Sequence, residues 1–249
     1  MGEWITGRNP VYEVLSSGRR QPLRLLVAEG VQEKGRLVDI LKFTASRKVK
    51  VERVRREQLD KIAANHQGIA LETSAYPYSG LHDILERAVE RKEPAFVLIL
   101  DTLQDPQNLG SLLRTAEAVG VHGVLLPLRR TATVTPAVVN ASSGASEHLL
   151  IAQVNLAQAI ATLKDAGIWV VGLDGGPQAE HASRVRLDGP LALVVGSEGE
   201  GMRQLVQESC DILMRLPMRG KIESLNAAVA GSIALYLAWQ ARGFSTIDV

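Results

Sequence analysis

Five short apolar runs divide the second part of the chain. The first, at residues 96–100, consists of five consecutive apolar residues, which is typical of a strand buried on both faces. Similar runs predict strands at 123–126, 168–172, 191–195 and 212–216. Helical spacing predicts helices at 109–119 and 155–166, each followed by a glycine, as is common after a helix end. Strands that alternate with helices predict an α/β fold with a mostly parallel sheet covered on both faces.

Shorter patterns in the first part of the chain predict a separate, small α/β domain. Strands are expected at 23–27, 49–54 and 68–71, and helices at 10–15, 37–43 and 57–63. Residues 76–80, Tyr-Pro-Tyr-Ser-Gly, have the composition of a turn or linker. Further helices are expected at 83–93 and, at the end of the chain, at 224–242. We therefore expect a first domain at 1–75, a linker at 76–94 and a second domain at 95–249.

Composition limits the class of protein. Of the 249 residues, 46% are hydrophobic but only 4% are aromatic, so the core is expected to be aliphatic. No apolar run has the length of a membrane span, and residues 1–8 lack the features of a signal peptide. Cys210 is the only cysteine. These features predict a cytoplasmic protein with no internal disulfide, no thiolate metal site and no contact with a membrane.

The net charge of +1 hides an uneven distribution. Residues 1–75 contain 14 Lys and Arg against 9 Asp and Glu, a balance of +5, and the remainder contains 14 against 18, a balance of −4. A basic first domain is typical of a module that binds a polyanion. Basic residues that only keep a small domain soluble would give the same count, so charge alone leaves both interpretations open.

Three unusual segments follow predicted strands, where the ligand site of an open α/β sheet is found. The first, residues 101–114, places Asn108 and Gly110 at a strand-to-helix turn and Arg114 one helical turn later. A guanidinium there could hold a phosphate or a developing oxyanion. An ordinary capped helix with a surface arginine would also explain this segment.

The second segment, residues 194–202, contains three glycines and two glutamates after a buried strand. The glycines would let the backbone approach a ligand closely. Their spacing is that of neither a phosphate loop nor a dinucleotide site. Glu198 and Glu200 would repel a pyrophosphate, but they could face a cationic sulfonium or bond to hydroxyl groups. A plain glycine-rich turn is the alternative.

The third segment, residues 216–226, begins where a predicted strand meets Pro217. Ser224 is a good N-cap for the final helix. Asn226, within the expected first turn, is a poor helix former, which indicates a second role for its side chain.

Together, the three segments resemble the motifs of the SpoU (TrmH) class of RNA 2′-O-ribose methyltransferases, within the SPOUT superfamily. The Asn-x-Gly-x-x-x-Arg motif of the class is matched by Asn108, Gly110 and Arg114. Its Gly-x-Glu-x-x-Gly motif is matched by Gly196, Glu198 and Gly201. Its third motif is matched by Pro217, Met218, Ser224, Leu225 and Asn226. Residues 7–11 and 66–69 resemble its substrate-binding domain, so the likeness covers nearly the whole chain.

The resemblance implies much of the fold and function. It implies an α/β-knot methyltransferase domain with a deep trefoil knot, a first domain with an L30e-like fold, and a homodimer. It implies methyl transfer from S-adenosylmethionine, without a metal, to a ribose 2′-hydroxyl of RNA. Within the class, the sequence is most similar to the RlmB-type enzymes, which modify a guanosine of 23S ribosomal RNA. A transfer RNA target is the alternative. The pair Ala227-Ala228 departs from the more usual Val-Ser, which concerns side chains near the cofactor.

The resemblance also implies roles for individual residues. Catalytic roles fall on Arg114, Asn108, Glu198, Ser224 and Asn226. Cofactor contacts fall on Leu173, Gly175, Gly196, Leu216, Met218 and Leu225. RNA contacts fall on Arg8, Asn9, His66 and Gln67. Because a guanidinium hardly deprotonates near neutral pH, we expect Arg114 to stabilise charge while Glu198 or a phosphate takes the hydroxyl proton. We expect the first domain to supply affinity for RNA and none for the cofactor.

Two other functions fit the sequence less well. A protein that keeps the fold but only binds RNA is disfavoured because the residues of the motifs are intact. An oxidoreductase that binds a dinucleotide would use the glycines of residues 172–176, whose spacing is poor. Binding of S-adenosylmethionine or of NAD distinguishes the three functions.

Overall fold

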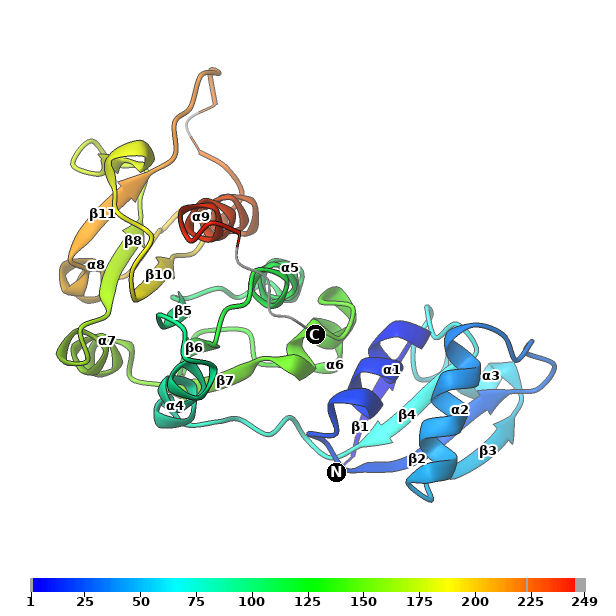
Figure 1. Ribbon diagram of the computed structural model, residues 1–249. Coiled ribbons are helices and arrows are strands. Elements are labelled where there is room, and N and C mark those ends of the chain that lie inside the picture. Colours follow the sequence, from blue (N-terminus) through cyan, green and yellow to red (C-terminus); the bar gives the residue numbers. More distant parts are fainter. Residues whose placement is uncertain (1, 223, 245–249) are drawn as a thin grey trace. The chain divides into compact units, whose positions relative to one another are not determined.

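The chain divides into two compact units (Figure 1). The computed structural model describes residues 2–222 and 224–244. The amino-terminal unit falls within residues 1–77 and 133–148, and the carboxyl-terminal unit within residues 78–132 and 149–249. Each unit is built around its own β-sheet.

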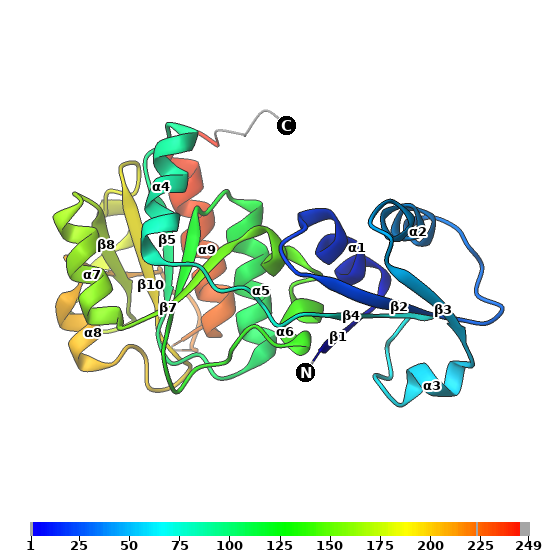
Figure 2. The same ribbon diagram turned by 90° about the horizontal axis from the view of Figure 1, so that it is seen from below.

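The amino-terminal unit has a four-stranded sheet in the order β1-β4-β2-β3. Its strands are β1 (Glu3–Thr6), β2 (Pro22–Ala28), β3 (Lys50–Val54) and β4 (Ile69–Thr73). Helices α1 (Arg8–Ser17) and α2 (Arg36–Ser46) lie on one face of the sheet, and α3 (Arg56–Asp60) lies on the other (Figure 2). Side chains alternate along β2, so Leu26 packs in a cluster with Leu59 of α3 while Leu25 is buried on the opposite face.

A segment from the middle of the chain completes this unit. It contains α6 (Pro136–Ala141) and the short 3₁₀ helix η1 (Ala145–His148). The Arg20 side chain is buried, and its Nε atom lies 3.0 Å from Glu147 Oε2, in a carboxylate that is also buried. Arg20 also pairs with Glu3. Because removing one partner of a buried ion pair strands the other charge, this pair fixes η1 to the rest of the unit.

The carboxyl-terminal unit has a seven-stranded sheet in the order β7-β6-β5-β10-β8-β11-β9, with every neighbouring pair parallel. The strands are β5 (Phe96–Leu100), β6 (Gly123–Pro127), β7 (Leu150–Val154), β8 (Trp169–Leu173), β9 (Glu180–His181), β10 (Leu191–Val195) and β11 (Ile212–Arg215). All the carboxyl ends therefore meet at one edge. The predicted α/β fold with a parallel sheet is confirmed.

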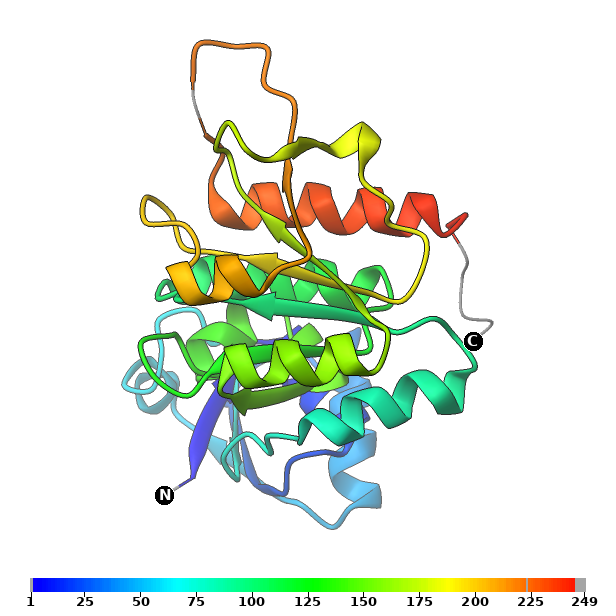
Figure 3. The same ribbon diagram turned by 90° about the vertical axis from the view of Figure 1, so that its left-hand side faces the viewer.

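Helices cover both faces of this sheet (Figure 3). One face carries α4 (Leu81–Arg91), α7 (Leu156–Asp165) and α8 (Gln204–Ser209), and the other carries α5 (Pro106–Ala118) and α9 (Ala227–Ala241). Helices α5 and α9 pack closely, because a Cβ at Gly231 would lie 2.6 Å from Leu112 Cδ2. Every helix among the described residues is too short or too polar to span a lipid bilayer.

The final helix starts later than predicted. Asn226 is its N-cap, and Asn226 Oδ1 accepts hydrogen bonds from the amides of Ala228 at 2.9 Å and Val229 at 3.2 Å. The prediction that Ser224 caps this helix is therefore wrong, as is the placement of Asn226 within its first turn. A further role for the Asn226 side chain stays a prediction. The strand β11 ends at Arg215, so Leu216 already belongs to the following loop.

Candidate active site

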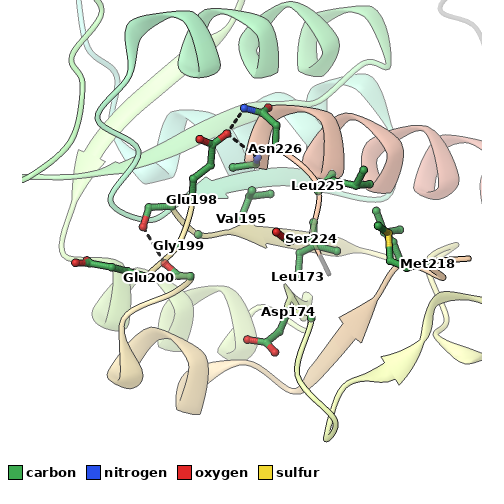
Figure 4. A pocket seen from close by; sticks show the side chains of 17 residues that line it. Leu173, Asp174, Val195, Glu198, Gly199, Glu200, Met218, Ser224, Leu225 and Asn226 are labelled. Carbon is green, nitrogen blue, oxygen red and sulfur yellow. Dashed lines mark hydrogen bonds between the residues drawn. The ribbon is translucent and has the colours of Figure 1, made fainter. Parts of the chain in front are cut away.

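A cavity of about 710 Å³ opens at the carboxyl edge of the seven-stranded sheet (Figure 4). It is lined by the loops after β8, β10 and β11 and by the first turn of α9. The lining contains all six residues predicted to contact a cofactor, namely Leu173, Gly175, Gly196, Leu216, Met218 and Leu225. It also contains Glu198, Ser224 and Asn226, which come from two of the three motifs. The fold thus brings segments far apart in the sequence to one place.

The loop after β10 needs glycine. The backbones of Ser197 and Gly201 bond to each other in both directions, with N–O distances of 3.0 and 3.1 Å. A Cβ at Gly196 would lie 2.2 Å from the carbonyl carbon of Gly201. Gly199 and Gly201 have φ values of +84° and +69°, which side chains disfavour. The glycine pattern therefore builds a tight turn that exposes backbone to the cavity.

An ion pair that the sequence did not predict holds the end of this loop. Asp101, directly after β5, is fully buried, and its Oδ1 atom lies 2.8 Å from Arg203 Nε and 2.7 Å from an Arg203 terminal nitrogen. Its Oδ2 atom accepts from the Arg203 amide at 2.8 Å. The sequence marks Asp101 as unusual because this charged residue directly follows an apolar strand. No sequence pattern identifies Arg203 as the residue that pairs with it.

Three side chains from three motifs meet at the cavity rim, and Figure 4 shows two of them, Glu198 and Asn226. Asn226 Nδ2 donates to Glu198 Oε1 and, at 3.1 Å, to Asn108 Oδ1. Asn108 Nδ2 donates to Glu198 Oε1 at 3.4 Å, and the Ala227 amide donates to the same oxygen at 3.3 Å. The Glu198 carboxylate also lies at the amino end of α9, where the helix dipole favours negative charge. We call Asn108, Glu198 and Asn226 the rim cluster.

Arg114 lies outside the cavity lining. It is exposed on α5, one turn after the buried Gly110. The neighbouring Thr115 bonds to Ser232 of α9, with 2.9 Å between the hydroxyl oxygens. Arg114 is therefore an exposed residue of the layer formed by α5 and α9, and it is adjacent to a residue through which these helices bond.

In the amino-terminal unit, the two segments predicted to contact RNA come together. The Arg8 amide donates to Gln67 Oε1 at 2.9 Å, and the Arg8 guanidinium donates to the carbonyl oxygens of Gln67 at 3.5 Å and Lys34 at 3.3 Å. Asn9 and Gln67 are exposed. These polar groups form one surface patch made from α1 and the loop before β4.

His66 does not share that exposure. Its side chain is 0% exposed, Nε2 lies 3.0 Å from Asp60 Oδ1, and Nδ1 accepts from the Gly68 amide at 2.9 Å. The RNA contact predicted for His66 is thus not one that this conformation offers. The ring instead fixes a turn in which Gln67 and Gly68 adopt φ values of +52° and +85°.

The described residues show no group of three or more His, Cys, Asp or Glu side chains arranged to hold a metal ion.

Comparison with known proteins identifies the family. A model of the SpoU rRNA Methylase family matches residues 95–236, and a model described as RNA 2′-O ribose methyltransferase substrate binding matches residues 4–79. The chain belongs to the SpoU family of RNA methyltransferases. The first match contains the whole rim cluster and Arg114.

Relatives with names and solved structures agree with this assignment. The TrmH family tRNA/rRNA methyltransferase YacO of Bacillus subtilis is 42% identical over 244 residues, which cover 96% of each chain. An AdoMet-bound rRNA methyltransferase of Sinorhizobium meliloti superposes with a TM-score of 0.79 at 25% identity, over 96% of this chain and 87% of that one. The SpoU methyltransferase AviRb of Streptomyces viridochromogenes, solved with AdoMet, gives a TM-score of 0.80 at 23% identity, over 97% and 91%. The last likeness shows the fold alone.

Proposed function

We propose that this SpoU protein is an S-adenosylmethionine-dependent RNA 2′-O-ribose methyltransferase of the RlmB type, acting in the cytoplasm on a guanosine of 23S ribosomal RNA. The observation that carries the proposal is the rim cluster beside the cavity. Membership of the family supports RNA methyl transfer, and the matched substrate-binding region supports ribose as the acceptor.

The cavity suits S-adenosylmethionine. Its volume of about 710 Å³ falls in the range of small-molecule sites, about 300–1,000 Å³. Leu173, Met218 and Leu225 supply apolar lining for a purine ring, while Asp174 and Glu198 supply carboxylates. Carboxylates suit ribose hydroxyls and a cationic sulfonium. Two structural relatives were crystallised with this cofactor.

The rim cluster suits control of the hydroxyl. When bound, the cofactor supplies a methyl group on a positively charged sulfur. The ribose hydroxyl must lie in line with that carbon and must lose its proton as the O–C bond forms and the C–S bond breaks. In the described part of the chain, the hydrogen bonds of Glu198 all fall on Oε1. We assign Oε2 as the atom that orients the hydroxyl and accepts its proton, with an RNA phosphate as the other candidate acceptor.

Arg114 is assigned to charge stabilisation. A permanent cation near the ribose would stabilise the negative charge that develops on oxygen. Arg114 lies on α5, outside the cavity lining, so its proposed role depends on what packs against α5 and α9. Helix α9 exposes Val229, Ile233 and Tyr236 to between 40% and 48%, at helical spacing beside α5. We propose that a second copy of the chain covers this face and that Arg114 acts at the resulting interface.

The amino-terminal unit is proposed to hold the RNA. Arg8, Asn9 and Gln67 form its polar patch, and residues 1–75 carry five more basic than acidic residues, 14 against 9. Neutralising phosphates with such residues supplies affinity that falls as salt rises. The relatives bear names that include transfer RNA as well as ribosomal RNA, so a transfer RNA target is the second candidate.

Two experiments test the function. Equilibrium dialysis should show binding of S-adenosylmethionine and none of NAD, and the reverse result would reject a methyltransferase. Mapping of 2′-O-methylation in RNA from cells with and without the protein should reveal one lost methyl group on a 23S guanosine. A loss in transfer RNA would identify the second candidate, and unchanged methylation in all RNA would contradict the proposal.

A further inference from the structure

The strand order separates the cofactor cavity from another part of the carboxyl edge. Every described residue that lines the cavity comes from the ends of β8 and β10, the loops after β8, β10 and β11, or the start of α9. The rim cluster spans the boundary between β5 and β10, because Asn108 follows β5 and Glu198 follows β10. Next to β5, on the side away from the cavity, lies β6. Nucleotides adjoining a ribose at the rim cluster therefore have the edge over β5 and β6 available to them.

The loop after β6 is fixed at this edge. Thr131 Oγ1 donates to the Leu103 carbonyl at 3.0 Å, and the Ala132 amide donates to the same oxygen at 2.7 Å. Leu103 belongs to the loop that leads from β5 into α5 and thus to Asn108. Neighbouring strands lie about 4.8 Å apart, so the loop after β6 lies roughly 10 Å from the strand that precedes Glu198.

This loop presents two consecutive arginines. Arg129 and Arg130 are exposed, and no carboxylate among the described residues pairs with either guanidinium. Arg203, by contrast, is neutralised by Asp101. Arg130 has φ of +59°, and Thr102 in the adjoining loop has φ of +58°. Such backbone strain in residues other than glycine gathers at functional sites.

We propose that Arg129 and Arg130 bind backbone phosphates of the RNA next to the target ribose, and so guide the strand across β6 and β5 to the rim cluster. The inference rests on the proposed RNA methyl transfer. Guanidinium groups suit phosphate oxygens because they donate two parallel hydrogen bonds. Contacts to phosphate position an RNA without reading its sequence, so the pair would serve any target of this enzyme.

The test compares two variants of the full chain. The first is Arg129→Gln with Arg130→Asn, since asparagine tolerates a positive φ. The matched control is Arg91→Gln with Lys92→Asn at the end of α4, which removes the same charge from the opposite edge of the sheet. Lys92 is exposed and has φ of +56°, so the backbone conformations also match. Thermal melting checks that both variants fold.

RNA binding is measured by fluorescence anisotropy with a labelled oligouridylate over a series of salt concentrations, without cofactor. The loop variant should bind more weakly, and the slope of log affinity against log salt should fall by about 1.4, because each phosphate contact on a single strand contributes about 0.7. The control should keep the slope of the unchanged protein. An unchanged slope in the loop variant, or an equal loss in both variants, overturns the proposal.

Methylation assays separate this proposal from the proposed function. With ribosomal RNA as substrate, the loop variant should show a higher KM and a nearly unchanged rate at saturating RNA. S-adenosylmethionine binding should be the same in all three proteins. If the unchanged protein binds no S-adenosylmethionine and methylates no RNA, the proposed function fails, whereas the salt slopes still report on the phosphate contacts.

Discussion

Glu198 is held by two segments that lie far from it in the sequence. Its Oε1 atom receives hydrogen bonds from Asn226, Asn108 and the Ala227 amide. Asn226 in turn uses its own oxygen to cap α9, so the amide that orients the carboxylate is itself held by a helix. Charged hydrogen bonds of this kind are among the stronger ones in proteins. The carboxylate is consequently oriented before any ligand arrives.

Replacing Arg114 tests the assigned chemistry. Arg114→Ala should barely change the affinity for S-adenosylmethionine, because Arg114 is absent from the cavity lining. The single-turnover rate of methyl transfer should fall by about two orders of magnitude or more, as for loss of other stabilisers of developing charge. Arg114→Lys should restore little, since lysine keeps the charge without the planar fork. A near-normal single-turnover rate in Arg114→Ala would remove Arg114 from the mechanism.

The thiol of Cys210 should be unreactive in the folded protein. Burial, with a smaller contribution from the Asp211 carboxylate, raises the pKa of Cys210 to about 12, and only the thiolate reacts. Modification by a disulfide reagent near pH 8 should be much slower in the native protein than in urea. The unfolded thiol loses its proton near pH 8.5, whereas the folded one keeps it, so the free energy of unfolding should fall as pH rises above about 9. Cys210→Ala should show a weaker decline, and rapid native labelling would show that the thiol is accessible.

At the scale of elements, α9 combines two faces. Ala234, Leu235 and Ala238 are buried against the rest of the unit, whereas Val229 and Ile233 remain 48% and 40% exposed. A helix that is apolar nearly all round is usually buried on more than one side. This exposed face is the one on which the proposed second copy is placed.

A charge on this face should separate the copies. Ile233→Glu places a carboxylate where apolar contact is proposed, and burying an unpaired charge is costly. Light scattering at micromolar concentration should give a dimer for the unchanged protein and a monomer for Ile233→Glu. Val89→Glu on α4 is the control, because Val89 is 76% exposed and lies on the other side of the sheet. A monomeric unchanged protein would contradict the dimer.

The predictability of the elements followed their length and periodicity. The run at residues 96–100 predicted β5 with both ends correct, because a strand buried on both faces leaves an uninterrupted apolar signal. The two-residue β9 and the six-residue α6 and α8 are too short for a period to show. The start of α9 was missed because both Ser224 and Asn226 are good caps, and only the fold decides which of them meets the free amides.

The candidate site was predictable for a different reason. Gly196, Glu198 and Asn226 stand in motifs whose spacing is itself informative, and the structure places all three around one cavity. Asp101 and Arg203, by contrast, are 102 positions apart. Their pairing could not be predicted, because an aspartate or an arginine can pair with any opposite charge that the fold brings near it. The knot implied by the resemblance stays a prediction, since hydrophobic patterns record which residues are buried and not the path of the chain between them.

At the scale of the whole molecule, the boundary between units does not follow the sequence order. Residues 133–148 fall inside the matched methylase region but belong to the amino-terminal unit. Their contacts are specific, because Asn140 Nδ2 donates to Thr6 Oγ1 at 3.3 Å and the Tyr76 hydroxyl donates to the Ser146 carbonyl at 3.0 Å. Residues 133–148 thus connect the unit proposed to transfer the methyl group with the unit proposed to bind RNA.

Deleting the first 77 residues should therefore damage more than RNA binding. The remaining chain would keep Glu147 without Arg20 and would expose Val138 and Val139, which are 0% exposed in the full chain. Exposed apolar groups promote aggregation. The fragment 78–249 should melt at a lower temperature than the full chain and bind a hydrophobic dye.

A second fragment, in which a Gly-Ser linker replaces residues 133–148, should recover solubility and bind S-adenosylmethionine while binding RNA weakly. If the first fragment is as stable as the second, residues 133–148 do not depend on the amino-terminal unit. If the second fragment binds RNA as well as the full chain does, the RNA affinity lies in the carboxyl-terminal unit instead.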